Sequence, residues 1–299
     1  MTKGRILVVE DDFDISNMLR IYFSGQDYEV SVAPRGGDAL ALTRQNLPHL
    51  IVLDIMLPDM DGYAVCRELR TTTRTSHIPI IFLTQKDERS DKIAGLELGA
   101  DDYITKPFDI EELKLRVQTA ISRSQRQNLS DPRSGLPSSH LIEEQLRLLM
   151  RMPGWAFVDV RLNNYEPFKE VYGFVAGDDV LRFTAVLMSE VVDDLGTPND
   201  FLGHPGGDNF IIITTPAAVA GIRDRLVKRF DEEIQTHYSF IDRDRGYIIA
   251  RGEDGAEHKI PLMTLDAGFV SSDTHTFSDI REITEIAAED RRRRHEGSA

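Results

Sequence analysis

Residues suited to phosphoryl chemistry follow four short apolar segments in the first part of the chain. They supply an acid pair, a carboxylate, a hydroxyl and an ammonium group: Glu10 with Asp11, Asp54, Thr84 and Lys106. A lone Asp after a strand often caps the next helix, so Asp54 by itself would indicate little. Clustered acids, however, repel one another unless a cation lies among them, and carboxylates are suitable ligands for Mg²⁺. We therefore expect Glu10, Asp11 and Asp54 to bind Mg²⁺.

The other residues of this set have distinct expected roles. A carboxylate can act as a nucleophile and form an acyl phosphate, which is the role expected for Asp54. Thr84 and Lys106 would hydrogen-bond and neutralise the phosphoryl oxygens, so that catalysis consists mainly of positioning and charge compensation. Lys106 precedes Pro107, and a cis bond is expected there because X-Pro bonds adopt that form at low cost.

The apolar segments themselves indicate a parallel sheet. Three of them are largely apolar, over residues 5–9, 50–58 and 78–83, and residues 101–105 are expected to form a fourth, short strand. Continuous apolar runs are typical of strands buried on both faces, as in a doubly wound α/β sheet. The carboxyl ends of such strands meet in one crevice. We therefore expect the chemically active residues that follow these segments to lie close together.

The first part of the chain, residues 1 to about 125, resembles the receiver domain of two-component response regulators. The resemblance rests on four motifs: VVED at residues 8–11, LDIMLPDMDG at 53–62, LT at 83–84 and GADDYITKPF at 99–108. It implies a flavodoxin-like fold and a sensor histidine kinase that donates the phosphoryl group to Asp54. It also implies that Met56 lends a backbone carbonyl to the Mg²⁺ and that Tyr103 is a switch aromatic coupled to Thr84.

Composition limits what the rest of the chain can be. The 299-residue chain has a formal net charge of −15 and a single cysteine, Cys66. Its length suits two domains that each bury a core. The negative charge and the lack of a basic recognition helix argue against direct DNA binding. Without an apolar run of transmembrane length or a signal peptide, a cytoplasmic protein with no membrane span is expected.

The boundary between the two domains is expected near residue 128. An amphipathic helix covers residues 110–128 and becomes polar toward its end, and Pro and Gly then break it over residues 131–137. We assign residues 1–125 to the receiver domain and residues 138–299 to an output domain. Residues 126–137 would contain the end of the linker helix and the opening motif of the output domain.

The output domain shows the alternation of an α+β fold. Strands are expected over residues 155–161, 200–204, 210–214, 247–251 and 262–270, and helices from residue 176, over residues 216–240 and over residues 278–295. The Gly-rich junction over residues 205–209 predicts a hairpin between the second and third of these strands.

This second half resembles the GGDEF domain of diguanylate cyclases, enzymes that condense two GTP molecules into cyclic di-GMP. The resemblance rests on SGLP at residues 134–137, YGFVAGD at 172–178 and a hairpin motif made of Gly206, Gly207, Asp208, Asn209 and Phe210. It implies a palm-like sheet with flanking helices.

Several residues depart from the pattern of that family. The family's metal-binding Asp corresponds to Arg161, the following acid to Asn163, a Lys to Glu166 and the guanine-binding Asn to Lys169. Asp178 and Asp208 are retained, whereas Asn209 replaces the second acid of the hairpin. Two-metal phosphoryl transfer needs carboxylates, and a guanidinium group repels Mg²⁺. These departures predict a degenerate, catalytically inactive GGDEF domain.

Two functions follow as alternatives. In the first, phosphorylation of Asp54 switches dimerisation and the state of the inactive module, which acts on an unidentified downstream protein. In the second, the chain is an active diguanylate cyclase with atypical metal ligation, for which Asp159 would supply a carboxylate if the register slipped by two residues. Arg161 and Lys169 also suggest a site for GTP or another anionic nucleotide, unless they are solvated or paired with Glu166, Glu170 and Asp178.

A phosphorylation-dependent homodimer is expected to use one charged face of the receiver domain. This face resembles the dimer surface of receivers fused to winged-helix domains, and its residues are Lys92, Asp101, Asp102, Glu112 and Arg116. Each exposed ion pair contributes only about 0–1 kcal/mol, so several pairs would have to act together.

Overall fold

The computed structural model describes residues 3–72, 74–84, 100–126, 129–251 and 256–298. The chain divides into two compact units, Met1–Gly135 and Leu136–Ala299, and the fold of each unit is described by itself.

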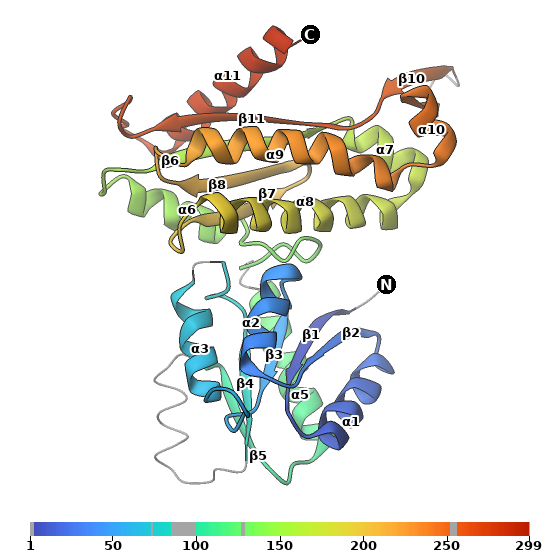
Figure 1. Cartoon of the computed structure of the whole chain (residues 1–299), viewed down its shortest axis with the longest axis vertical. Helices are drawn as coiled ribbons and strands as arrows, with labels where there is room; N and C mark the ends of the chain where they lie inside the picture. Colours follow the sequence, from blue (N-terminus) through green and yellow to red (C-terminus); the bar gives the residue numbers. More distant parts are fainter. Residues whose placement is uncertain (1–2, 73, 85–99, 127–128, 252–255, 299) are drawn as a thin grey trace. The chain divides into compact units, whose positions relative to one another are not determined.

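The first unit contains a five-stranded parallel sheet (Figure 1). Its strands, given in their spatial order, are β2 (Tyr28–Ala33), β1 (Gly4–Val9), β3 (Leu50–Leu53), β4 (Ile80–Thr84) and β5 (Asp102–Thr105). The described helices are α1 (Phe13–Ser24), α2 (Gly36–Gln45), α3 (Gly62–Thr71) and α5 (Ile110–Arg126).

Helices cover both faces of this sheet because its strands are apolar on both faces. Alternate residues of a strand point to opposite faces, and Val8 and Val52 pack with Leu19 and Phe23 of α1 and with Leu113 and Val117 of α5. Residues on the other face, such as Leu7 and Ile51, are equally buried, and α2 and α3 carry the buried Leu40, Val65 and Cys66. The predicted doubly wound, flavodoxin-like fold is confirmed.

The strand that leads to Asp54 is shorter than the sequence predicted. β3 ends at Leu53, and the segment after Asp54 turns back so that Met56 pairs with Asp61. Gly62 begins α3 directly against this turn, since a β-carbon there would lie 2.2 Å from the carbonyl oxygen of Asp54. Pro79 also lies outside β4, although its carbonyl accepts a hydrogen bond from Ile51 N. β2 was not predicted at all.

The second unit contains a four-stranded antiparallel sheet and a separate two-stranded ribbon (Figure 1). The large sheet has the order β11 (Thr264–Ser271), β6 (Ala156–Asn163), β8 (Asn209–Thr214) and β7 (Phe201–Gly206), and the ribbon pairs β10 (Glu257–Pro261) with β9 (Tyr247–Arg251). The helical elements are α6 (Ser139–Leu149), α7 (Tyr165–Tyr172), α8 (Phe174–Leu195), α9 (Val219–Glu233), the 3₁₀ helix η1 (Ile234–His237), α10 (Phe240–Arg245) and α11 (Ile280–Ser298).

Both faces of the antiparallel sheet are covered. On one face, Phe157 and Ile211 pack in a cluster with Ile142 of α6 and Ile283 of α11. The alternate residues of β6, among them Val158, point to the opposite face and are equally buried. The α8 and α9 helices pack against each other, and α9 also contacts β6 and β11. The predicted α+β architecture of this half is confirmed.

Details of the second unit differ from the sequence-based prediction. The expected helix over residues 216–240 consists of α9 and η1 and ends at His237, and Ser239 then caps the amino end of a new helix, α10, with its own side chain. The edge strand β10 and the helices α6 and α7 were not predicted. None of the helices in the described part of the chain is both long and apolar enough to cross a membrane.

Candidate functional site

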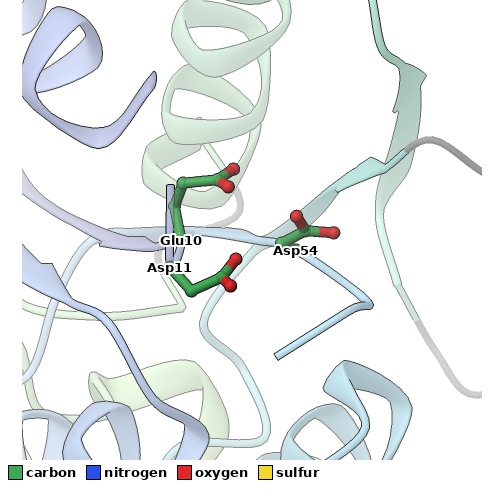
Figure 2. A group of neighbouring side chains, drawn as sticks. All are labelled: Glu10, Asp11 and Asp54. Carbon is green, nitrogen blue, oxygen red and sulfur yellow. The ribbon is translucent and has the colours of Figure 1, made fainter. Parts of the chain in front are cut away.

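Three carboxylates converge at the carboxyl ends of β1 and β3. Val9 and Leu53 are partners in the parallel register, and the next residue of β3 continues the pairing, since Asp54 N donates to Val9 O at 2.9 Å. Carboxylate oxygens of Glu10, Asp11 and Asp54 all lie within 4.8 Å of one another, and Figure 2 shows the side chains of Glu10 and Asp11 directed toward the side on which Asp54 lies. Glu10 and Asp54 are only 1% and 5% exposed, whereas Asp11 is exposed to solvent.

A single ammonium group bridges the two buried acids. Lys106, which follows β5, donates to Glu10 Oε2 and to Asp54 Oδ2, both at 2.7 Å. Its side chain is only 9% exposed, so these contacts replace most of the water that the charges would otherwise bind. The Lys106–Pro107 bond is cis, as predicted.

The pKa values of this pair reflect burial and the shared cation. Burial raises the pKa of Glu10 to about 7, and the neighbouring Asp54 adds to the rise, while Lys106 opposes it. Burial would lower the pKa of Lys106, but its hydrogen bonds to Asp54 and Glu10 outweigh burial and raise that pKa. The ammonium group therefore stays charged at neutral pH, and Glu10 exchanges its proton near neutrality.

The donor set suits a hard divalent cation. It consists only of carboxylate oxygens, and exposed Asp11 leaves one side of the cluster open to water and to phosphate oxygens, as Mg²⁺ requires. Met56 contacts the site through its backbone, since Met56 N donates to Asp54 Oδ1 at 3.1 Å. Tyr103 lies on β5, half-buried, with its ring centroid 6.4 Å from that of Phe82. Thr84 ends β4, and its side chain lies outside the described structure, so the coupling expected between Thr84 and Tyr103 stays a prediction.

In the second unit, Arg161 is paired with the acid of the hairpin turn. Arg161 Nε donates to Asp208 Oδ2 at 3.1 Å, and Leu162 N donates to Asp208 O at 3.0 Å. The two residues meet because β6 and β8 are in register, with Arg161 opposite Asn209. Gly206 and Gly207 adopt the positive φ angles of 125° and 67° that form this turn. Asp208 is only 19% exposed, so the guanidinium group is its main counter-charge.

Other polar residues on the same face of β6 are also paired. Asn163 donates to Asp266 Oδ2 at 2.8 Å and to Thr264 Oγ1 at 3.1 Å, both on β11. Asp159, the residue that a two-residue slip would have made a ligand, accepts from Arg291 of α11 at 2.7 Å, and both side chains are largely buried. The negative charge of Asp159 is therefore already balanced by Arg291.

Lys169 lies on α7 and is paired as well. Its ammonium group is 2.5 Å from Glu166 Oε2 and lies 5.5 Å and 5.9 Å from the ring centroids of Tyr165 and Phe174. Asp178, on α8, is half-buried, and no donor within the described residues contacts it. Phe210 is buried and its ring stacks on His204 with centroids 4.2 Å apart.

The sequence-based hypothesis named these residues but could not name their partners in the structure. Asp266 and Arg291 lie more than one hundred residues after Asn163 and Asp159, as the separations of these hydrogen bonds show. Only the register of β11 on β6 and the packing of α11 bring them together. No local pattern in the sequence reports such contacts.

Comparison with known proteins agrees with both halves of the structure. Residues 6–118 match the family described as response regulator receiver domain, and residues 128–258 match the family described as diguanylate cyclase, GGDEF domain. The receiver domain of response regulator 1452 from Francisella is 36% identical over 41% of this chain and 99% of that chain, with a TM-score of 0.39.

Two curated relatives are similar over part of their length. The response regulator ArlR of Staphylococcus saprophyticus is 41% identical over 131 residues, which cover 44% of this chain and 57% of that protein. RpaA of Synechocystis, a DNA-binding dual master transcriptional regulator, is 45% identical over 122 residues, which cover 41% of this chain and 51% of RpaA. The chain thus spans about half the length of these relatives. It has the receiver domain of response regulators, followed by a GGDEF domain.

Proposed function

We propose that this response regulator accepts a phosphoryl group on Asp54 from a sensor histidine kinase and signals through a GGDEF domain that does not synthesise cyclic di-GMP. The receiver half of the proposal rests on the cluster of Glu10, Asp11 and Asp54 with its shared cation, Lys106. The observation that carries the output half is the ion pair of Arg161 with Asp208.

In the receiver domain, both oxygens of Asp54 are engaged before the reaction. Oδ1 accepts from Met56 N and Oδ2 accepts from Lys106. One carboxylate oxygen attacks the phosphorus atom, and the bond from phosphorus to the nitrogen of the donor histidine breaks with its electron pair on nitrogen. The new acyl phosphate moves negative charge outward, and Lys106 can follow it to a phosphoryl oxygen. Glu10, Asp11, Asp54 and the backbone carbonyl of Met56 would hold Mg²⁺, which compensates charge on the phosphoryl oxygens when bound.

In the GGDEF domain, the sign of the charges opposes metal binding. Two unit charges 4 Å apart interact by about 1 kcal/mol in bulk water and by about 4 kcal/mol near a protein surface, and a divalent ion doubles the value. Arg161 is 47% exposed, so the repulsion lies toward the lower end of that range. The repulsion nevertheless adds to the loss of a carboxylate ligand at residue 161, and the pairing of Asp159 with Arg291 removes the nearest substitute.

We also propose that the GGDEF domain can bind an anionic nucleotide such as GTP without converting it to product. Arg161 and Lys169 could hold phosphates, but each is already paired, with Asp208 and with Glu166. An anionic nucleotide would therefore have to displace two carboxylates. Direct DNA binding is not proposed, because the second half of this chain matches a GGDEF domain, and the DNA binding in the name of RpaA concerns that protein.

We also propose that phosphorylation promotes a homodimer through the charged receiver face. Lys92 lies outside the described residues. Arg116 donates to both carboxylate oxygens of Asp102 and to Glu112, and Arg70 pairs with Asp101 within the same chain. A dimer must exchange these pairs for pairs between subunits, which costs little because exposed pairs contribute about 0–1 kcal/mol each.

The affinity for Mg²⁺ should depend on pH through Glu10. A carboxyl group must lose its proton before it binds metal, and the pKa of Glu10 is raised to about 7. Affinity should therefore fall as the pH drops below 7, by up to about ten-fold per pH unit for one competing proton. Calorimetric titration with MgCl₂ at pH 8, 7 and 6 measures this, and Glu10→Gln should flatten the dependence. Equal wild-type affinity at pH 8 and pH 6 would contradict the expectation.

Asp54→Asn should abolish labelling by acetyl phosphate in the presence of Mg²⁺, because the amide is not a nucleophile for phosphorus. Asp12→Asn is the matched control. Asp12 lies beside the cluster but caps α1 by accepting from Asp14 N and Ile15 N, and an Asn side chain can accept in the same way. It should label like the wild type. Undiminished labelling of Asp54→Asn, measured by intact mass, would refute the assignment.

No cyclic di-GMP should form from GTP and Mg²⁺, even on protein activated with beryllofluoride. Product is measured by chromatography after long incubation at high enzyme concentration, with an active diguanylate cyclase as the positive control. Calorimetry with GTP, with and without Mg²⁺, completes the test. Metal-independent binding that Arg161→Ala removes supports nucleotide binding without turnover, whereas turnover would establish the alternative of an active cyclase.

Activation with beryllofluoride should double the mass of the chain in sedimentation velocity. Arg116→Glu should prevent this, because it places a third acid beside Asp102 and Glu112. Arg44→Glu, which reverses a surface arginine paired with Glu68 on another face, is the control and should still dimerise. An unchanged mass on activation of the wild type would exclude the dimer.

A further inference from the structure

A buried arginine of the first strand holds a segment that lies far along the chain. Arg5, the second residue of β1, is only 5% exposed. Its Nε donates to Leu47 O at 2.9 Å, and its Nη1 and Nη2 donate to Arg133 O at 3.4 Å and to Ser134 O at 3.5 Å. Backbone carbonyls thus accept from three different nitrogens of one guanidinium fork, a geometry that lysine cannot reproduce.

His49 adds a second attachment to the same segment. Its Nδ1 accepts from Arg5 N at 2.9 Å, so the proton of the ring is on Nε2. Nε2 lies 3.1 Å from Pro132 O and donates to it. Arg5 is the second residue of β1 and His49 directly precedes β3, so the attachment lies at the amino ends of the two strands whose carboxyl ends carry the acidic cluster.

The attached segment is itself folded to fit this surface. Asp131 Oδ1 accepts from Arg133 N at 2.9 Å and from Ser134 N at 3.0 Å, and Asp131 and Ser134 are buried. Gly135 has a φ angle of +81°, and a β-carbon there would lie 2.6 Å from Arg5 Nη2 and 3.2 Å from Leu47 Cβ. Only glycine meets both requirements at this position.

This segment belongs by sequence to one domain and by packing to the other. The match to the GGDEF family begins at residue 128, whereas the compact unit of the receiver extends to Gly135. We propose that residues 131–135 form a clasp, by which the receiver domain binds the opening segment of the GGDEF domain through Arg5 and His49. The clasp attaches the chain to the receiver sheet as far as Gly135, the last residue of the first unit. Residues 131–135 are therefore not a flexible linker.

Trypsin reports the clasp directly in the full-length chain, because Arg133 lies inside it. Cleavage after Arg133 requires the segment to leave the receiver surface, and local opening of this kind sets the rate. Two variants release the clasp by different means. Arg5→Met removes the donors but keeps an apolar chain of similar length, and Gly135→Ala places a methyl group against Arg5 Nη2.

Gly154→Ala is the matched control. Gly154 has nearly the same φ angle, +80°, but a β-carbon there meets nothing within 4 Å. This variant carries the same backbone strain without the close approach. Cleavage after the exposed Arg292 of α11 serves as the internal reference for protease activity.

Both clasp variants should be cleaved after Arg133 at least about ten-fold faster than the wild type, with Gly154→Ala unchanged. Circular dichroism and thermal unfolding establish that each variant is folded. If Arg5→Met fails to fold, because unpaired carbonyls are left buried, Gly135→Ala decides the outcome. Wild-type cleavage rates in folded Gly135→Ala, or equal acceleration in Gly154→Ala, would overturn the proposal.

Discussion

Three carboxylates gathered at one edge of a sheet require a cation among them, and Lys106 supplies it. The ammonium group is shared between Glu10 and Asp54, both of which are buried. Without it, two buried acids would face each other in a poorly solvated site, and one of them would have to stay protonated. Burial raises the pKa of Glu10 to about 7 and the neighbouring Asp54 adds to the rise, although Lys106 opposes it. The three carboxylates thus share one ammonium group, and a donor set of this kind suits a divalent ion.

The GGDEF domain also pairs carboxylates with cations, but there each of two acids has a cation of its own. There, the acid at the hairpin turn meets a guanidinium group from the neighbouring strand, and Asp159 meets Arg291. Each of these two carboxylates is matched by one fixed cation. The cluster of the receiver domain instead has three carboxylates around one ammonium group. This difference in the balance of charge supports the proposal that the GGDEF domain has lost its metal site.

The parallel sheet of the receiver has the acidic cluster at one end of its strands and the contacts with residues 131–135 at the other. β1 and β3 hold the acidic cluster at their carboxyl ends and the clasp residues Arg5 and His49 at their amino ends. Both strands are buried on both faces. A buried arginine at the amino end of such a strand is costly unless it is hydrogen-bonded, and the carbonyls of Leu47, Arg133 and Ser134 accept from all three of its nitrogens.

The sequence by itself determined the two folds and the receiver cluster. Apolar runs that end near Glu10 and Asp54 indicate strands buried on both faces, as in a parallel sheet, and the carboxyl ends of such strands meet in one crevice. It did not determine the ends of β3, the division of the helix after Pro216 or the edge strand β10, since caps and edge pairing depend on neighbours. The partners of Arg161, Asn163 and Asp159 were decided only by tertiary structure. Pairing across strands and helices depends on register and packing between distant segments, and no local pattern encodes those contacts.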